Sequence, residues 1–466
     1  MLGQVSWKVL TLAAASAALA TEARAAEAAP AVQSSSTLSL QDAIQFALKH
    51  QPGVLAAKAR LIAARAAERI PGAAWRPTVG ALAEVVGGSA NNSTATFISN
   101  GVLDLPRVGG TPVRTASELT PYPTTLVGVG VRQELFDFGR IAAETAAASA
   151  LAAVDEQRAR ASRLDTVLSV TEAYYAVHAA HSVLEVASQA EGRARLHRDY
   201  AEAGVKSGLR APIDLTRAEA DLTRFAVSRI RADGSLRVAK AVFAAAVGVS
   251  APELDAGPAA QDEGNIPARA DVQARARDAD PAVRSAIFLA RAQRLRTEAI
   301  ERSTRPNLFA TAAVSGRAGG APASNAVTPE GNGWLPSVLN YSAALVLEWP
   351  IYRGVTSAQA EASRRQELAR LAEVEVARQA ATTRAEQAYR SLEETTVALD
   401  ALTRAAEAAK ANHEQAEARF KSGLGTSTEL ADAETLRIDA EIQLAMGRFE
   451  VAVARAVLAR VMSEDR

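Results

Sequence analysis

Lys206-Ser207-Gly208-Leu209 recurs 215 residues later as Lys421-Ser422-Gly423-Leu424, and this repeated stretch decides the fold. Two further pairs keep the same spacing, Ala173-Tyr174 with Ala388-Tyr389 and Ala218-Glu219 with Ala433-Glu434. A spacing that stays constant over about 45 residues indicates a tandem duplication rather than chance. Each copy of the tetrapeptide comes after a long stretch without proline, so it predicts the turn of a helical hairpin in which glycine supplies a positive φ.

Upstream of these matches the spacing is longer. Arg76-Pro77 recurs as Arg305-Pro306, and His50-Gln51-Pro52-Gly53-Val54 partly matches Ala279-Asp280-Pro281-Ala282-Val283, in both cases 229 residues apart. The longer spacing predicts an extra loop in the first copy, between residues 84 and 131. We therefore expect two structural repeats, roughly 38–257 and 267–466, joined by a linker at 258–266.

Each repeat predicts the same order of elements. A helix comes first, at about 38–74 and 269–304, and two strands, a long helix and a second closing helix come after it. The strands are expected at about 76–88, 123–137, 305–316 and 339–352, and the hairpin tips at about 204–210 and 421–427. The long helices, at about 140–203 and 355–420, would each extend for roughly 100 Å at 1.5 Å per residue. A helix of that length favours a coiled-coil partner.

A stripe at heptad spacing runs along the second long helix. Its members are Ala388, Leu392, Thr395, Leu399, Leu402, Ala406, Ala409, His413, Ala416 and Phe420. Such a stripe indicates the core of a coiled coil, with His413 as a packed or polar-layer residue. The predicted fold class is mainly α with a small β part: a tandem-duplicated long-helix coiled coil with four strands per chain.

The predicted strands alternate between apolar residues and smaller or more polar ones, as in Val127-Gly128-Val129-Gly130-Val131-Arg132, and aromatic residues collect near their ends. This pattern is typical of transmembrane β-strands, and it equally fits a half-buried sheet on a soluble core. A sheet in lipid must close on itself, and single-chain barrels begin at about eight strands. If the strands cross a membrane, four per chain therefore require an oligomer of two or three chains.

The N-terminus predicts export. Lys8 precedes an apolar run from Val9 to Ala20, and Ala23-Arg24-Ala25 offers a cleavage site between small residues. This is the pattern of a secretory signal peptide at 1–25, with a linker after it at 26–37. No later run is long and apolar enough to predict a transmembrane helix.

The composition excludes several classes of function. The 466 residues contain no cysteine, which excludes disulfides, a thiol nucleophile, Cys-ligated metals and a lipid-bearing N-terminal cysteine. The 52 basic residues balance the 52 acidic ones, which argues against a nucleic-acid partner. His178 and His181 are spaced to share a helix face, but no third ligand completes a metal site. We expect no enzyme activity, no metal and no cofactor.

Together these features resemble the TolC-type outer-membrane efflux duct family, from Leu38 to Ser463. Each motif is only moderately specific, but together, in duplicate and in order, the motifs are a strong signal. The stretches that carry the resemblance are Leu38-Ser39-Leu40-Gln41-Asp42-Ala43, the Pro52 region, Gln133-Glu134-Leu135-Phe136-Asp137, and the two tips with the Asp214-Leu215 and Glu429-Leu430-Ala431-Asp432-Ala433 that come after them.

The resemblance implies a homotrimer whose strands form a twelve-stranded barrel in the outer membrane of a Gram-negative bacterium, in contact with its lipid. It also implies a helical tunnel in the periplasm and a passive export duct for small molecules or proteins. The partners implied are a periplasmic adaptor (membrane fusion) protein and an inner-membrane pump or ABC transporter, in a tripartite efflux pump or a type I secretion system. The alternative function is an exported helical scaffold without channel activity, in which the strands form a soluble cap.

The resemblance further assigns the two tips to contact with the adaptor. The residues concerned are Ser207, Gly208, Leu209, Ser422, Gly423 and Leu424. The family often has valine before the glycine, where this chain has serine preceded by lysine in both repeats. The identity of the adaptor is therefore left open.

An acidic constriction of the tunnel is expected just beyond the tips, at Asp214, Glu429 and Asp432. Helix capping explains Asp214 and Glu429 equally well, whereas Asp432 lies a turn further into its helix. The counterpart of Asp432 in the first repeat is Arg217, so the charge of the ring is expected to alternate in sign.

Overall fold

The computed structural model describes residues 37–89, 121–250, 254–258, 266–319 and 338–463. The expected signal peptide (1–25), most of the expected linker at 258–266 and the extra loop of the first repeat lie outside the described residues. The chain divides into two compact units. Unit 1 consists of Met1–Ala56, Ser162–Gln273 and Arg384–Arg466, and unit 2 of Ala57–Ala161 and Ala274–Thr383.

The described residues are mainly helical, and the two repeats show matching orders of elements, as the predicted fold class requires. The first repeat contains β1 (Thr37–Leu38), α2 (Leu40–His50), α3 (Pro52–Ala67), α4 (Arg69–Gly72), the 3-10 turn η2 (Ala73–Trp75), β2 (Thr78–Ser89), β3 (Pro121–Phe136), α5 (Arg140–Lys206), α6 (Pro212–Val247) and β4 (Asp255–Ala256). The second contains α7 (Arg269–Ala279), α8 (Pro281–Arg302), β5 (Asn307–Gly319), β6 (Val338–Glu348), α9 (Gly354–Lys421) and α10 (Ser427–Val461).

The first helix of each repeat is interrupted, and the expectation of one continuous helix was wrong. α2 ends before Pro52 and α7 ends before Pro281, each of which opens a new helix. Proline lacks the N–H that a helix interior needs and pushes the preceding residue out of the helical region. Asp280 accordingly has a ψ of 126°, and its side chain accepts a hydrogen bond from the N–H of Ala282.

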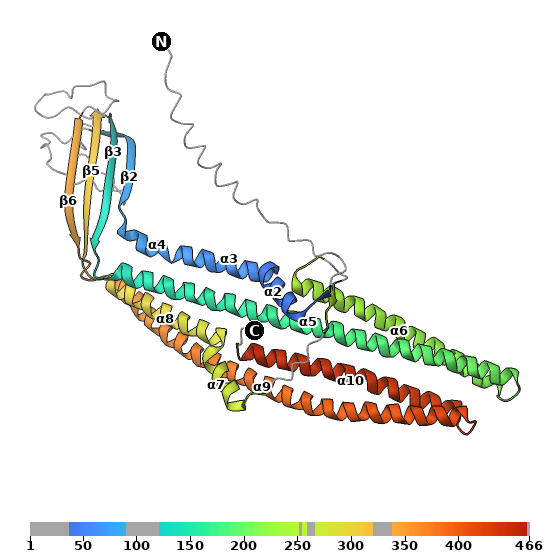
Figure 1. The fold of residues 1–466 in the computed structure, drawn as a ribbon. Helices are drawn as coiled ribbons and strands as arrows, with labels where there is room; N and C mark the ends of the chain where they lie inside the picture. Colours follow the sequence, from blue (N-terminus) through green and yellow to red (C-terminus); the bar gives the residue numbers. More distant parts are fainter. Residues whose placement is uncertain (1–36, 90–120, 251–253, 259–265, 320–337, 464–466) are drawn as a thin grey trace, which may run out of the picture. The chain divides into compact units, whose positions relative to one another are not determined.

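Four antiparallel strands of unit 2 form one sheet in the order β2-β3-β5-β6 (Figure 1). Val129 of β3 pairs with Ala81 on one side and with Val314 on the other, so the two repeats meet at the centre of the sheet. β6 is shorter than expected because it ends at Glu348, directly before Trp349-Pro350. A proline there cannot donate to the ladder.

The two faces of this sheet differ in chemistry. Val79, Val129, Val314 and Leu345 share one face, and all four side chains are exposed. The opposite face carries polar residues. Among them are Arg132, Glu134, Thr311 and Ser315, and the Arg132 guanidinium lies 3.7 Å from the centre of the Phe309 ring. The sheet thus presents an apolar surface on one side only.

The long helices that the sequence predicts form two helical hairpins. α5 pairs with α6 and α9 pairs with α10 (Figure 1). The heptad stripe is core as predicted, because Leu392, Ala409 and His413 are buried. Gly447 of α10 allows close packing, since a Cβ there would lie 2.5 Å from Cδ1 of Leu402 on α9.

The base of the first hairpin holds the main hydrophobic core of unit 1. Tyr174, Val177 and Phe243 are buried there with Ala43 and Ala47 of α2. The short parallel pair of β1 and β4 lies beside this cluster. Among the described residues, none of the helices combines the length and the apolarity needed to span a bilayer.

Candidate functional site

Both hairpin tips are built by the same glycine turn. The φ angles of Gly208 and Gly423 are +74° and +75°. In the first tip the N–H of Leu209 donates to the carbonyl of Gly204 over 2.9 Å, and Leu424 repeats this bond in the second. This is the Schellman pattern at the end of a helix. A Cβ on either glycine would meet no atom within 4 Å, so the backbone angle and not crowding selects glycine.

The leucine of each turn faces solvent. In Schellman turns the residue at this position often packs back onto its own helix, but Leu209 is 85% exposed and Leu424 is 76% exposed. The neighbouring Ser207 and Ser422 are also exposed. Each tip therefore presents one large apolar side chain in a polar setting.

The expected constriction acids lie in the first turns of α6 and α10. Asp214 Oδ1 accepts a hydrogen bond of 2.8 Å from the Ser427 hydroxyl. Glu429 forms an ion pair of 3.1 Å with Arg419, and its N–H donates to the Thr426 side chain over 3.1 Å. Thr426 is therefore the N-cap of α10. The Glu429 carboxylate itself turns to Arg419.

Asp432 differs from these two acids. Its side chain is exposed, and it has no hydrogen bond or ion pair with any other described residue. Arg217, its counterpart in the first repeat, donates to the Thr428 hydroxyl over 2.6 Å. Of the three acids, Asp432 alone keeps a carboxylate free for a solute or a second chain.

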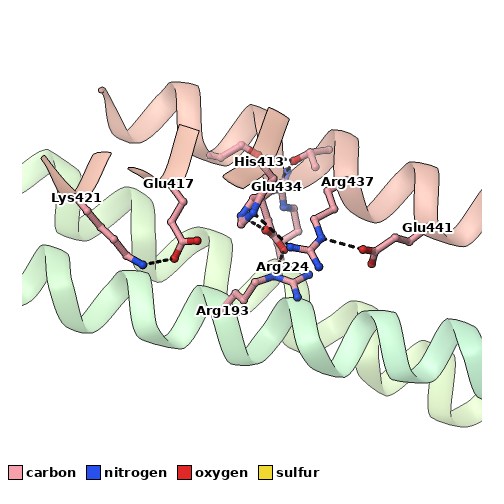
Figure 2. Close-up of polar contacts among 10 residues, drawn as sticks. Arg193, Arg224, His413, Glu417, Lys421, Glu434, Arg437 and Glu441 are labelled. Atoms are coloured by element: carbon pink, nitrogen blue, oxygen red, sulfur yellow. Dashed lines mark hydrogen bonds and ion pairs between the residues drawn. The ribbon is translucent and has the colours of Figure 1, made fainter. Parts of the chain in front are cut away.

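A buried polar cluster, which the sequence did not single out, lies further along the same helices (Figure 2). Glu434 of α10 accepts from Nε of Arg193 on α5 over 2.8 Å. Its other carboxylate oxygen lies 2.6 Å from Nε2 of His413 on α9. The exposed fractions of Glu434 and His413 are 3% and 1%. Three helices from the two hairpins thus converge on one carboxylate.

His413 also contacts an arginine through its other ring nitrogen. Arg437 Nη1 lies 3.4 Å from Nδ1 of His413, and arginine can only donate. Nδ1 therefore faces a donor, and Nε2 faces the Glu434 carboxylate. Arg437 is balanced by Glu441 at 2.8 Å. His413 thus lies between the Arg193–Glu434 and Arg437–Glu441 ion pairs.

Burial and the neighbouring side chains shift the pKa of Glu434 in opposite directions. Burial alone raises the pKa of this carboxyl, but the His413 hydrogen bond and the Arg193 charge outweigh it and leave the pKa below its ordinary value. Nearby on α5, burial lowers the pKa of His197, although the charges of Glu434 and Glu417 oppose that shift. At neutral pH the cluster thus holds an ionised Glu434 beside an uncharged His197.

The remaining contacts between the hairpins lie beside this cluster. Phe225 and Ile438 are buried together with Ala190 and Ala194. Closer to the tip, the guanidinium of Arg210 lies 3.8 Å from the centre of the Phe420 ring. Apolar packing and polar contacts therefore join the hairpins over several turns.

His181, one of the two histidines considered as metal ligands, contacts an acidic residue instead. His181 Nε2 lies 3.0 Å from Asp255, which also receives Lys240 at 2.7 Å. Tyr174 donates its hydroxyl to the carbonyl of Gly257 over 2.7 Å. These contacts tie the end of the first repeat to α5 and α6. Within the described part of the chain, no three residues of metal-binding type come together.

A known protein family matches most of the chain. Its model, described as outer membrane efflux protein, covers residues 43–249 and 313–464. Among curated proteins no significant match was found.

Solved structures share the fold at low sequence identity. The outer-membrane channel OprN gives a TM-score of 0.72 at 20% identity, covering 91% of this chain and 89% of that one. The outer membrane protein VceC from Vibrio cholerae gives 0.69 at 17% identity, covering 91% and 96%. The open state of the MtrE channel from Neisseria gonorrhoeae gives 0.68 at 20% identity, covering 91% and 88%.

Proposed function

We propose a working arrangement from one premise: the chain belongs to the outer membrane efflux protein family. It is an outer membrane efflux channel of a Gram-negative bacterium and a transport protein, not an enzyme. The scaffold without channel activity is thereby set aside. Our proposals concern how the channel assembles, which partners it binds and where its tunnel narrows.

The assembly we propose is a homotrimer with a twelve-stranded barrel. The sheet of β2, β3, β5 and β6 is exposed and apolar on one face, which suits contact with lipid. Its outer strands β2 and β6 each lack a partner on one side within the described chain. Open edges in lipid leave backbone groups unsatisfied, so further copies must complete the sheet.

The partner proposed for the tips is a periplasmic adaptor that works with an inner-membrane pump or ABC transporter. The support is the pair of exposed leucines, Leu209 and Leu424, held outward by identical turns. Ser207, Gly208, Ser422 and Gly423 shape those turns. The adaptor surface should contain an apolar pocket that binds each leucine side chain. The choice between a tripartite efflux pump and type I secretion, and the substrate class, belongs to those partners.

The constriction is assigned first to Asp432, with Glu429 and Asp214 beside it. The observation that carries this is the free, exposed carboxylate of Asp432 one turn inside α10. Three copies around one axis would place three free Asp432 carboxylates at the constriction, alternating with the Arg217 side chains, and free carboxylates attract cations. Asp214 and Glu429 are already engaged by Ser427 and Arg419, so they contribute less to the field.

Planar-bilayer recordings of the purified channel test this assignment. We expect Asp432→Asn to lower the cation selectivity and change the single-channel conductance, whereas Asp439→Asn, one further exposed acid along α10, changes them less. Unaltered selectivity in Asp432→Asn would remove this residue from the constriction. Absence of any ion current in the unmodified protein would contradict the proposed trimeric duct itself.

A further inference from the structure

The Arg-Pro pair that recurs in both repeats lies where the first helices end and the sheet begins. Arg76-Pro77 precedes β2, and Arg305-Pro306 precedes β5. Proline disfavours the helical region for the residue before it, and Arg76 accordingly has a φ of −88° and a ψ of 149°. The proline therefore ends the helical segment, but it does not explain why arginine precedes it in both copies.

The two arginines are exposed charges at the same end of the sheet. β2 and β5 run in the same direction, because each pairs antiparallel with β3 between them (Figure 1). With strands about 4.8 Å apart, their first residues lie about 10 Å from each other. Both residues are exposed, and neither guanidinium has a hydrogen bond or an ion pair with another described residue. This end of the sheet therefore has two unpaired positive charges.

The acids of β3 and β6 at this end already have partners. Glu134 forms an ion pair of 3.3 Å with Arg132, and Glu348 forms one of 3.3 Å with Arg353. Each of these acids is thus balanced by an arginine of its own. Arg76 and Arg305 are the excess positive charge, so the ligand that suits them is an anion from outside the chain.

A hollow of about 380 Å³ lies on the apolar face of the sheet, beyond the two arginines. Residues of β3, β5 and β6 that share this face line it: Val131, Gln133, Ala310, Ala312, Ala343 and Leu345. The three alanines lie where the same face elsewhere carries larger apolar residues such as Val129 and Val314. A hydrocarbon chain that filled the hollow would gain contacts with the sheet that an empty hollow lacks.

Gln133 connects the hollow with the first arginine. Its Nε2 donates to the carbonyl of Trp75 over 2.7 Å, and Arg76 is the next residue along the chain. Ala310, which pairs with Gln133, follows Arg305 at about 17 Å along an extended strand. The arginines and the hollow therefore come in the order of a phospholipid, in which the phosphate precedes the acyl chains.

Exposed aromatic side chains indicate that this end of the sheet lies at the surface of the bilayer. Trp75 and Trp349 are 39% and 59% exposed, and Tyr352 is 82% exposed. Tryptophan and tyrosine collect at the level of the lipid headgroups. Lipid phosphate groups would therefore lie at the height of the two arginines, whereas a site for free phosphate needs no such apolar surroundings.

We propose that this end of the sheet binds an anionic phospholipid of the leaflet nearest the helices. Arg76 and Arg305 bind the phosphate, because a guanidinium presents paired donors to its oxygens, and one acyl chain lies in the hollow. An anionic headgroup is preferred to a zwitterionic one, because the unpaired guanidiniums repel the cationic group of the latter. This inference rests on the proposed barrel, since the apolar face meets lipid only if the barrel forms.

Quenching of tryptophan fluorescence by brominated lipids measures this preference, because Trp75 and Trp349 lie at this end of the sheet. The purified channel is placed in vesicles of phosphatidylcholine and phosphatidylglycerol, with bromine on the acyl chains of one lipid at a time. We expect the unmodified protein to prefer phosphatidylglycerol by about fivefold or more, since each arginine near an anionic lipid contributes about fivefold to binding.

Two matched double variants separate the site from net charge. Arg76→Gln with Arg305→Gln should bring the preference to within about twofold of none. Arg237→Gln with Arg365→Gln, which removes two exposed arginines of α6 and α9, should leave it unchanged. Equal preferences in the two double variants would overturn the proposal. Absence of quenching by either brominated lipid would instead contradict the barrel on which the proposal rests.

A second pair of variants tests the position of the acyl chain. Ala312→Leu fills the hollow, whereas Ala83→Leu adds the same side chain elsewhere on the apolar face. We expect Ala312→Leu to lower the preference by about twofold or more, since the acyl chain loses its contacts with the sheet, and Ala83→Leu to leave it unchanged. An unchanged preference in Ala312→Leu would overturn the placement of the acyl chain.

A change of salt distinguishes the two sources of phosphate. Sodium phosphate replaces sodium chloride at equal ionic strength, and the quenching measurement is repeated on the unmodified protein. A lipid site should keep its preference for phosphatidylglycerol. Loss of the preference would indicate a site for free phosphate and would overturn the assignment to lipid.

Discussion

The turn between β3 and α5 depends on one buried carboxylate, and replacing it gives a measurable prediction. Asp137 is 4% exposed, and its two oxygens accept the N–H of Gly139 over 2.9 Å and the N–H of Ile141 over 2.5 Å. The turn also places Phe138 at a φ of +54° and Gly139 at +87°. Asp137 therefore caps the helix and holds two residues in the left-handed region at once.

The size of the effect is set by the groups left unpaired. Asp137→Ala removes the acceptor of two N–H groups, and Ile141 is fully buried. A buried donor without a partner costs about 1–3 kcal/mol, and loss of a helix cap costs about 0.5–2 kcal/mol. We expect a loss of about 2–4 kcal/mol in the free energy of unfolding of unit 2. At roughly 2–4 °C per kcal/mol for a unit of this size, Tm falls by about 5–15 °C.

Circular dichroism at 222 nm during heating of the detergent-solubilised protein measures this shift. Asp137→Asn keeps one acceptor oxygen and should lose less than half as much. Asp155→Ala, which removes a partly exposed carboxylate and its ion pair with Arg158 from the same helix, should change stability by less than about 1 kcal/mol. A Tm for Asp137→Ala within 1 °C of that for Asp155→Ala would refute the reasoning.

Two further predictions concern unit 1. The pKa of His197 is lowered in the fold, so the unfolded state binds the proton more readily, and stability falls as pH drops below about 6.5; His197→Gln should show a smaller loss of Tm between pH 7.5 and 5.5, and an equal loss would contradict this. Gly208→Ala forces a Cβ into a φ of +74° at about 1–2 kcal/mol, whereas Gly234→Ala, inside α6 with nothing within 4 Å of its Cβ, should stabilise by about 0.5–1 kcal/mol. Chemical denaturation of both variants checks the opposite signs.

Local chemistry made much of this fold predictable. The glycine of the repeated tetrapeptide requires a positive φ, and the structure has it at both Gly208 and Gly423. The alternation around Val129 predicted strands with one apolar face, which the register between β2, β3 and β5 shows. The heptad stripe predicted a core that the burial of Leu392 and Ala409 confirms. In each case the signal lies within a single turn, strand or helix.

Contacts between distant residues left no such signal. Arg193 and Glu434 are 241 residues apart, and each is one of many charged residues on a long helix. The one hint was His413, a titratable side chain in an otherwise apolar stripe, which the sequence could only assign to a packed or polar layer. A buried imidazole needs a partner, but its spacing does not say which of the facing acids supplies it. Placing Glu434 required the packing of α9 against α10.

The similarity between the repeats located the two hairpins, but it did not locate the contacts between them. The 215-residue spacing located the hairpins because identical residues build identical turns. The contacts between the hairpins depend instead on where the two copies differ. Arg217 and Arg224 became Asp432 and Asp439, and Arg193 became Ala408. The buried contact of Arg193 with Glu434 therefore has no counterpart between the corresponding residues Ala408 and Glu219. Similarity between the repeats thus predicts where each hairpin turns, and only the differences between the repeats decide which contacts join the hairpins.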